Sequence, residues 1–195
     1  MKKEAKSIRQ NILILLEEPS AEELLKKFIP RFFPSLRCTY RHFAGVNNLL
    51  KRLEKTIRNH EDSSCPIVIL CDQDEKDCVE LKKIILGLCK KSGQYSRCAV
   101  RIACHELESW YLAQLDVVAQ HFGVPELVRR QKNYQNPDNI GKPSEVMSRI
   151  TKGNYQKIKG SRIMGEHLDS CVSRSRSFKC FVDTLKRFSE LSSTK

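Results

Sequence analysis

The chain of 195 residues lacks any long apolar run, and its longest uninterrupted apolar stretches span only five or six positions. Because a helix needs about 20 consecutive apolar residues to cross a bilayer, the sequence predicts no transmembrane helix. The opening Met-Lys-Lys-Glu-Ala-Lys also lacks the apolar stretch of a secretory signal. We therefore expect a cytoplasmic protein without membrane attachment.

Paired cysteine motifs are missing as well. The nine cysteines are scattered along the chain, and no two of them form a Cys-x-x-Cys pair. The ligand pairs of a structural zinc site are thus absent. An odd number of cysteines in a chain without an export signal also argues against a disulfide framework. We expect free, reduced thiols.

Positive charge is abundant and unevenly placed. The net charge is +12, and residues 129–162 carry nine basic and two acidic side chains, against twenty and seventeen in residues 1–128. Such a segment favours a nucleic-acid partner, because neutralising phosphates releases condensed counterions. The alternative is a solvated basic surface. The candidate nucleic-acid contacts are Lys142, Lys152, Lys157, Lys159 and Arg162 for phosphates, with Tyr155 stacking on a base.

Apolar strand-like runs alternate with helical patterns through the first two thirds of the chain. This order predicts an α/β fold with a mostly parallel sheet flanked by helices. Ser20 is expected to cap the first helix. The predicted strands are 11–16, 37–43, 66–71 and 98–103, and the predicted helices are 20–29, 46–58, 78–91 and 106–121.

The composition changes after residue 124, where Asn, Gln, Lys and Gly become frequent. No further strand is expected there, and short helices are predicted over 144–150, 161–168 and 177–191. We therefore expect an α/β core over residues 1–124, with a basic loop and a helical C-terminal lobe over 125–195 packed on it.

Acidic residues follow three of the predicted strands. Glu17 follows the first strand, Asp72 and Asp74 follow the third, and Glu106 and Glu108 come shortly after the fourth. In an open parallel sheet, ligands bind outside the carboxyl ends of the strands. Because side chains alternate along a strand, Asp72 and Asp74 can face the same way and share a Mg²⁺ or Mn²⁺ ion. Glu17 would be a further ligand or a general acid/base.

Each acidic cluster also has a structural interpretation. Asp72 and Asp74 can form a surface turn, whereas Glu17, Glu106 and Glu108 can complement the dipole of the helix that follows. Of Glu17 and Glu18, Glu18 is the one to which the structural interpretation applies more readily. Structural or core roles are the simpler interpretation of the other polar and aromatic residues in this region, which are His105, Trp110 and Tyr111.

Three motifs in this order carry a resemblance to a known family. They are ILLEEPS at 14–20, ILCDQD at 69–74 and RIACHELESWYLA at 101–113. Together they resemble the Toprim-like family called domain of unknown function 4276, which is similar to the Toprim domains of overcoming-lysogenization-defect nucleases. Similar residues continue through 142–144 and 155–157 to 177–178, so the resemblance covers nearly the whole chain.

The resemblance implies roles for individual residues. In Toprim domains the glutamate after the first strand acts as general acid/base and the DxD pair binds Mg²⁺, which correspond here to Glu17, Asp72 and Asp74. This chain carries Glu18 where many Toprim domains carry glycine. Members of the group often stand beside ATPases and are suspected of antiphage defence.

Three functions follow as hypotheses. The first is a Mg²⁺-dependent nuclease of Toprim type that cleaves DNA or RNA. It would act with an ATPase partner and could form a homo-oligomer. The second is a non-catalytic nucleic-acid-binding or regulatory subunit of an ATPase complex. The third, a phosphatase with Asp72 as nucleophile, is disfavoured because Glu75 and Lys76 stand where the haloacid-dehalogenase pattern requires x and Thr or Val.

Overall fold

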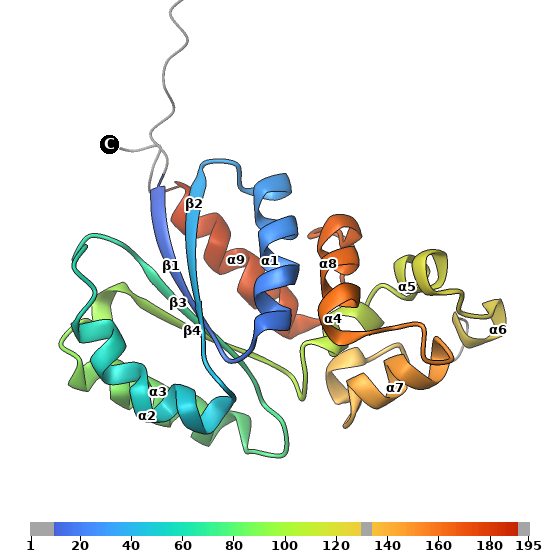
Figure 1. The fold of residues 1–195 in the computed structure, drawn as a ribbon, viewed down its shortest axis with the longest axis horizontal. Coiled ribbons are helices and arrows are strands. Elements are labelled where there is room, and N and C mark those ends of the chain that lie inside the picture. Colours follow the sequence, from blue (N-terminus) through green and yellow to red (C-terminus); the bar gives the residue numbers. More distant parts are fainter. Residues whose placement is uncertain (1–9, 130–133, 191–195) are drawn as a thin grey trace, which may run out of the picture.

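The computed structural model describes residues 10–129 and 134–190. Four parallel strands form one sheet in the order β2-β1-β3-β4, with helices on both faces (Figure 1). The α/β fold predicted from the sequence is confirmed. The strands are β1 (Gln10–Leu16), β2 (Leu36–His42), β3 (Ile67–Asp72) and β4 (Cys98–Ala103).

The two faces of the sheet are covered by different helix pairs. On β1, Ile12, Ile14 and Leu16 face one side and Leu13 and Leu15 face the other, as alternation along a strand requires. Helices α1 (Pro19–Phe32) and α9 (Arg176–Glu190) pack on the first face, and α2 (Val46–Arg58) and α3 (Cys78–Lys91) on the second. Every residue of β3 is buried, which is typical of a central parallel strand.

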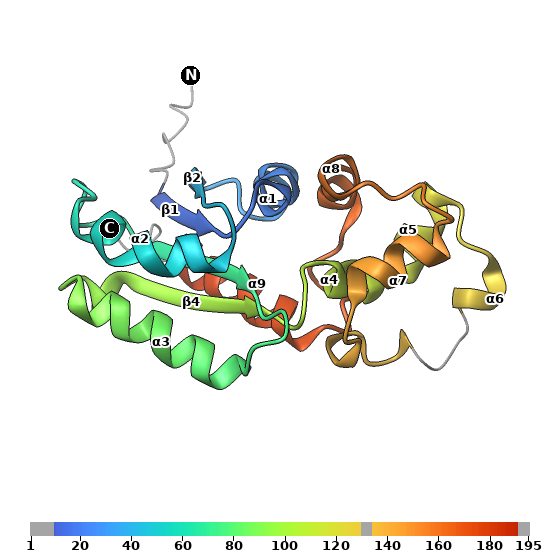
Figure 2. The ribbon, with the colours of Figure 1, turned by 60° about the horizontal axis from the view of Figure 1, so that its bottom comes forward.

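A helical lobe, formed by α4 to α8, lies beyond the carboxyl end of β4 (Figure 2). Its helices are α4 (Glu108–Leu112), α5 (Leu115–Phe122), α6 (Glu126–Arg129), α7 (Pro143–Ile150) and α8 (Lys157–His167). Short 3₁₀ turns occur at η1 (Tyr95–Arg97) and η3 (Pro137–Asn139). Within the described part of the chain, no helix is long and apolar enough to span a membrane.

Helix α8 lies closely against α1, and a glycine makes this approach possible. A Cβ atom added to Gly165 would lie 2.3 Å from the carbonyl oxygen of Leu24 and 2.9 Å from Cβ of Lys27. The backbone of one helix therefore occupies the space that a side chain on the other would need. This contact joins the helical lobe to the sheet.

Two local predictions are wrong. Helix α1 begins at Pro19 with Glu18 as the N-cap residue, and Ser20 lies in its first turn, where its hydroxyl donates a hydrogen bond to Glu18 Oε1 (2.5 Å). The single helix predicted over 106–121 is two helices, α4 and α5. The chain turns at Gln114 (φ −130°, ψ 59°), whose side chain donates to Asp169 O (2.8 Å) and accepts from Asp169 N (2.9 Å).

The other C-terminal helices lie near their predicted positions, although α8 starts at Lys157 and not at 161. The predicted end of the last helix, residue 191, lies outside the described residues, as do the basic positions 130 and 132. Helix α9 packs on β4, whereas α4 packs on α7. The chain thus leaves the sheet after β4 and returns to it with α9. The expected division of the chain at residue 124 stays a prediction.

Candidate metal and nucleic-acid site

Glu17 joins three elements at the carboxyl end of the sheet. It follows β1, and its Oε1 accepts a hydrogen bond from Val46 N at the start of α2 (2.9 Å). Its Oε2 accepts from Asp72 N at the end of β3 (3.0 Å). Burial raises the pKa of Glu17, the two backbone hydrogen bonds oppose this, and the negative charge of Asp74 adds to it. The side chain is therefore fixed in orientation beside Asp72.

Asp72 is the last residue of β3 and is only 8% exposed. Burial raises the pKa of Asp72 well above its ordinary value, and the nearby carboxylates of Glu108 and Glu17 raise it further. The positive charge of Lys157 opposes these effects. The region around Asp72 therefore has an excess of negative charge in a poorly solvated place.

Asp74 lies beyond the strand. It has a left-handed backbone (φ +51°), and its N–H donates to the carbonyl oxygen of His105 (2.7 Å). Because β3 ends at Asp72, the alternation expected to place both aspartates on one side of a strand does not extend to Asp74, and that argument is wrong. Asp74 is nevertheless close enough to Glu17 for its charge to raise the pKa of Glu17.

Glu108 is completely buried at the start of α4. Its Oε1 accepts a hydrogen bond from the hydroxyl of Tyr155 (2.7 Å), and its Oε2 has no partner among the described residues. Burial raises the pKa of Glu108, which the Tyr155 hydrogen bond and the charge of Lys157 oppose. A buried carboxylate oxygen without a partner is costly, so this oxygen could accept a hydrogen bond or bind a cation.

Glu106 has a different position from that of Glu108. Its Oε2 accepts a hydrogen bond from Ser144 N (2.6 Å), in the first turn of α7. Glu106 therefore satisfies an unpaired N–H of α7 and not, as its structural interpretation expected, of the helix that follows it in sequence. The neighbouring His105 has a left-handed backbone (φ +57°), and its N–H donates to Gln73 Oε1 (3.3 Å).

Trp110 and Tyr111 are core residues, as the structural interpretation expected. Both are fully buried. Trp110 Nε1 donates to Ser177 Oγ (2.9 Å) and the Tyr111 hydroxyl donates to Ser161 Oγ (2.9 Å). Their polar atoms therefore connect α4 to α9 and α8.

One of the predicted phosphate contacts lies beside the carboxylates. Lys157 is half-exposed, and its Nζ forms a salt bridge with Glu18 Oε1 (2.8 Å). Although burial disfavours its charge, the hydrogen bond to Glu18 and the charges of Glu108, Glu18 and Asp72 raise the pKa of Lys157. Sequence reasoning gave Glu18 no part in the site, and no spacing signal pointed to its pairing with a residue 139 positions later.

The other basic candidates lie on the surface of the lobe. Arg162 pairs with Glu23 of α1 (2.6 Å), and Lys142, the N-cap residue of α7, pairs with Glu145 in that helix (2.9 Å). Lys152 is exposed and has a left-handed backbone (φ +50°).

The predicted stacking role of Tyr155 is wrong. Its side chain is buried. The centroid of its ring lies 6.1 Å from the ring centroid of Tyr111 and 5.8 Å from that of Phe122. The helix beside it carries Gly160, where an added Cβ would lie 2.3 Å from the Tyr155 ring. Tyr155 is therefore held in the core, where it supports Glu108.

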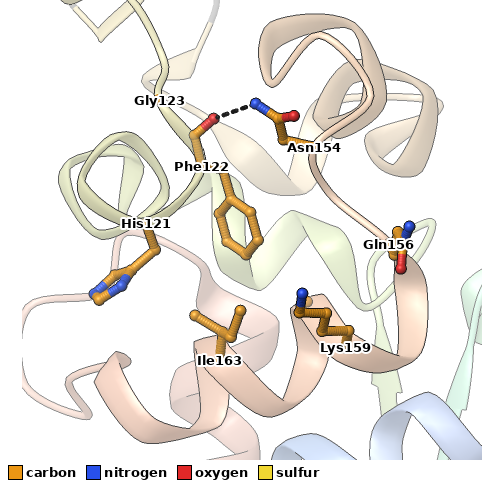
Figure 3. A pocket seen from close by; sticks show the side chains of 8 residues that line it. His121, Phe122, Gly123, Asn154, Gln156, Lys159 and Ile163 are labelled. Atoms are coloured by element: carbon orange, nitrogen blue, oxygen red, sulfur yellow. Dashed lines mark hydrogen bonds between the residues drawn. The ribbon is translucent and has the colours of Figure 1, made fainter.

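Lys159 points into a separate pocket of about 330 Å³ between α5 and α8 (Figure 3). Figure 3 shows Phe122 and Ile163 in its lining, with Asn154 donating to the carbonyl oxygen of Phe122 (3.4 Å). None of the strand-end carboxylates lines this pocket. Lys159 therefore faces a different space from Lys157.

The strand-end carboxylates are near one another but do not form a complete metal-coordination site. Across residues 10–129 and 134–190, no three His, Cys, Asp or Glu side chains are grouped closely enough to hold a metal ion by themselves. A cation at this place would bind through one or two carboxylates and complete its coordination with water or substrate.

Comparison with known proteins identifies the family. No curated protein matches the chain. The C-terminal region of the OLD protein of Xanthomonas campestris pv. campestris is similar in structure, with a TM-score of 0.50 and 14% sequence identity over 95% of this chain and 96% of that one. At that identity the likeness shows a shared fold. The family described as a domain of unknown function, DUF4276, matches residues 16–186, and the chain belongs to this family.

Proposed function

We propose that the chain is a Mg²⁺- or Mn²⁺-dependent nuclease of Toprim type that cleaves phosphodiester bonds in nucleic acid. The observation that carries the proposal is the buried Asp72, which lies at a strand end among the carboxylates of Glu17 and Glu108. A role in antiphage defence together with an ATPase partner is part of the proposal. Membership of the family and the likeness to an OLD C-terminal region are compatible with this assignment.

The residues fit a hard divalent cation. Their ligand atoms are carboxylate oxygens, which Mg²⁺ and Mn²⁺ prefer. The unpartnered Oε2 of Glu108 and the excess negative charge around Asp72 are both conditions that a cation relieves. Asp72 and Asp74 would hold the ion, with Glu17 and Glu108 beside them. A bound ion would stabilise charge on the scissile phosphate and lower the pKa of a water molecule.

The chain's own groups have separate tasks in this proposal. Glu17, held by two backbone N–H groups, would accept or donate a proton at the attacking or leaving oxygen. Lys157 would bind a phosphate oxygen after exchanging its salt bridge with Glu18. Lys142, Lys152, Lys159 and Arg162 would bind the nucleic-acid backbone further out on the lobe, without reading its sequence.

The test is cleavage of single-stranded DNA, double-stranded DNA and structured RNA by the purified chain in Mg²⁺ or Mn²⁺. We expect Asp72→Asn and Asp74→Asn to abolish cleavage, because each removes a charged ligand while keeping the shape of the side chain. Glu61→Gln is the matched control, since Glu61 is an exposed acidic residue remote from the strand ends in sequence and should leave cleavage unchanged.

Thermal denaturation with and without Mg²⁺ supplies a second measurement. We expect Mg²⁺ to raise the Tm of the wild type and of Glu61→Gln, and to have no effect on Asp72→Asn. Cleavage that persists in Asp72→Asn would refute the proposal. Stabilisation by Mg²⁺ without cleavage of any substrate would instead favour a regulatory, nucleic-acid-binding subunit.

A further inference from the structure

A second and larger hollow runs along the free edge of the sheet. It has a volume of about 1060 Å³ and lies beside β4, the last strand in the order β2-β1-β3-β4. Val100, Arg101 and Ile102 of β4 line it, and residues of α3 and α9 form its two walls. Figure 2 shows these helices on opposite sides of β4. We call this hollow the β4 groove.

The backbone of β4 offers free hydrogen-bonding groups to the groove. Ala103 O accepts from Gln73 N, so the polar backbone groups of Ala103 face β3. Because successive residues of a strand point their N–H and C=O groups to opposite sides, those of Val100 and Ile102 face the groove. Arg101 Nη1 donates a hydrogen bond to the carbonyl oxygen of Val100 (2.7 Å), so this oxygen already has a partner.

Ile102 is only 8% exposed, but no backbone or side-chain partner within the described residues is found for its N–H or its C=O on the groove side. One position along, Cys104 N donates to Ser177 Oγ (3.4 Å), which ends the free edge. One residue of an antiparallel strand added here would accept a hydrogen bond from the N–H of Ile102 and donate one to its C=O.

The walls of the groove are basic around an apolar interior. Val79 on α3 is 60% exposed, and Leu86 lies further along the same helix. Five basic and two acidic side chains line the groove, and the acidic ones are Asp138 and Asp183. Asp138 already accepts hydrogen bonds from the hydroxyls of Ser175 (2.6 Å) and Ser177 (3.2 Å). Among the basic side chains, Lys83 forms a salt bridge with Glu80 (2.7 Å) and Arg101 donates to Cys180 O (2.9 Å), which leaves Lys82, Arg176 and Arg187 to face a ligand.

We propose that the β4 groove binds an extended acidic segment of a partner protein, which adds to the sheet beside β4. Strand addition uses the backbone for affinity and alternate side chains for specificity. The free N–H and C=O of Ile102 match a peptide backbone, and the exposed Val79 matches an apolar side chain. The basic walls match acidic side chains on the other positions of that strand. This inference does not depend on the nuclease proposal.

Fluorescence anisotropy with defined peptides tests the proposal on the full chain. The probe is a labelled peptide of about ten residues, the upper length of ordinary strands, in which Glu and Val alternate. A peptide in which Lys and Val alternate is its control. We expect the Glu–Val peptide to bind, with an affinity that falls as salt rises, and the Lys–Val peptide not to bind.

Charge reversal locates the binding. We expect Lys82→Glu with Arg187→Glu to weaken binding of the Glu–Val peptide by about tenfold or more, because both side chains line the groove. The matched control is Lys51→Glu with Arg52→Glu, which makes the same change in net charge on the exposed surface of α2. It should change the affinity by less than about twofold, as expected for charges remote from the contact. All four residues are exposed, so folding is not at risk.

Hydrogen exchange followed by NMR distinguishes strand addition from loose charge attraction. The proposal requires the amide of Ile102 to exchange more slowly when the Glu–Val peptide is bound. It is overturned if the peptide does not bind, if both double variants weaken it equally, or if the exchange of Ile102 is unchanged. It is also overturned if an oligothymidylate, and not the peptide, needs Lys82 and Arg187 for binding.

Discussion

Gly165→Ala is expected to push α8 away from α1 and to weaken the contact between the helical lobe and the sheet. The added Cβ would lie 2.3 Å from the carbonyl oxygen of Leu24 and 2.9 Å from Cβ of Lys27. Carbon and carbonyl oxygen normally approach no closer than about 3.3 Å, so α8 would have to move away from α1 by about 1 Å. The obstacle is helix backbone, which cannot rotate aside as a side chain can.

Two opposing effects set the magnitude. Overpacking of a close contact costs about 1–3 kcal/mol, and the value here belongs near the upper end because backbone is involved. Alanine in a helix interior regains about 0.5–1 kcal/mol relative to glycine. We therefore expect Gly165→Ala to lower the free energy of unfolding by about 2 kcal/mol. The shift of α8 should also disturb the salt bridge between Lys157 and Glu18.

Gly87→Ala is the control for the same chemical change. Gly87 lies inside α3, and apart from its chain neighbours and the backbone of its own helix no atom would lie within 4 Å of its added Cβ. This variant should gain about 0.5–1 kcal/mol from helix propensity alone. Urea denaturation of both variants measures the difference. The reasoning is refuted if Gly165→Ala is as stable as the wild type or behaves like Gly87→Ala.

Two further predictions concern buried polar groups and thiols. Tyr155→Phe removes the hydroxyl that donates to Glu108 Oε1 and leaves both oxygens of a buried carboxylate unpaired, so we expect the free energy of unfolding to fall by about 1–3 kcal/mol. Tyr95→Phe, at an exposed position, should have almost no effect, and equal effects would contradict the role of Tyr155. In thiol labelling of the native protein, the exposed Cys171 and Cys180 should react first. Cys71 should react only on unfolding, since burial raises the pKa of its thiol; rapid labelling of Cys71 would count against the buried position of β3.

Local hydrophobic pattern was enough to predict the strands and their flanking helices, but not the strand order β2-β1-β3-β4. The apolar residues at 67–71 are all buried in β3, and the bounds of α2 and α3 agree with the prediction because each helix buries one apolar stripe. Such patterns are local in sequence. The strand-end carboxylates could be found for the same reason, since parallel strands bring their carboxyl ends to one edge.

Long-range hydrogen bonds explain what the sequence did not predict. Helix 106–121 is interrupted because Gln114 bonds the backbone of Asp169, a partner 55 positions away. Tyr155 was predicted to face nucleic acid because it lies among lysines, but its hydroxyl bonds a carboxylate 47 positions earlier. Neither partner can be identified from spacing, because both contacts form only when the lobe folds against the core.

The path of the chain through the lobe has a consequence for how such proteins diversify. The chain enters the lobe after β4 and comes back to the sheet at α9, and these two points touch through Cys104 N and Ser177 Oγ (3.4 Å). An insertion whose two ends meet can grow, shrink or be exchanged without breaking the sheet that carries it. The lobe holds Lys157 and Glu108, whereas the sheet holds Glu17 and Asp72. Replacing this insertion would therefore leave Glu17 and Asp72 in place, while the groups that now stand beside them, Lys157 and Glu108, would be exchanged.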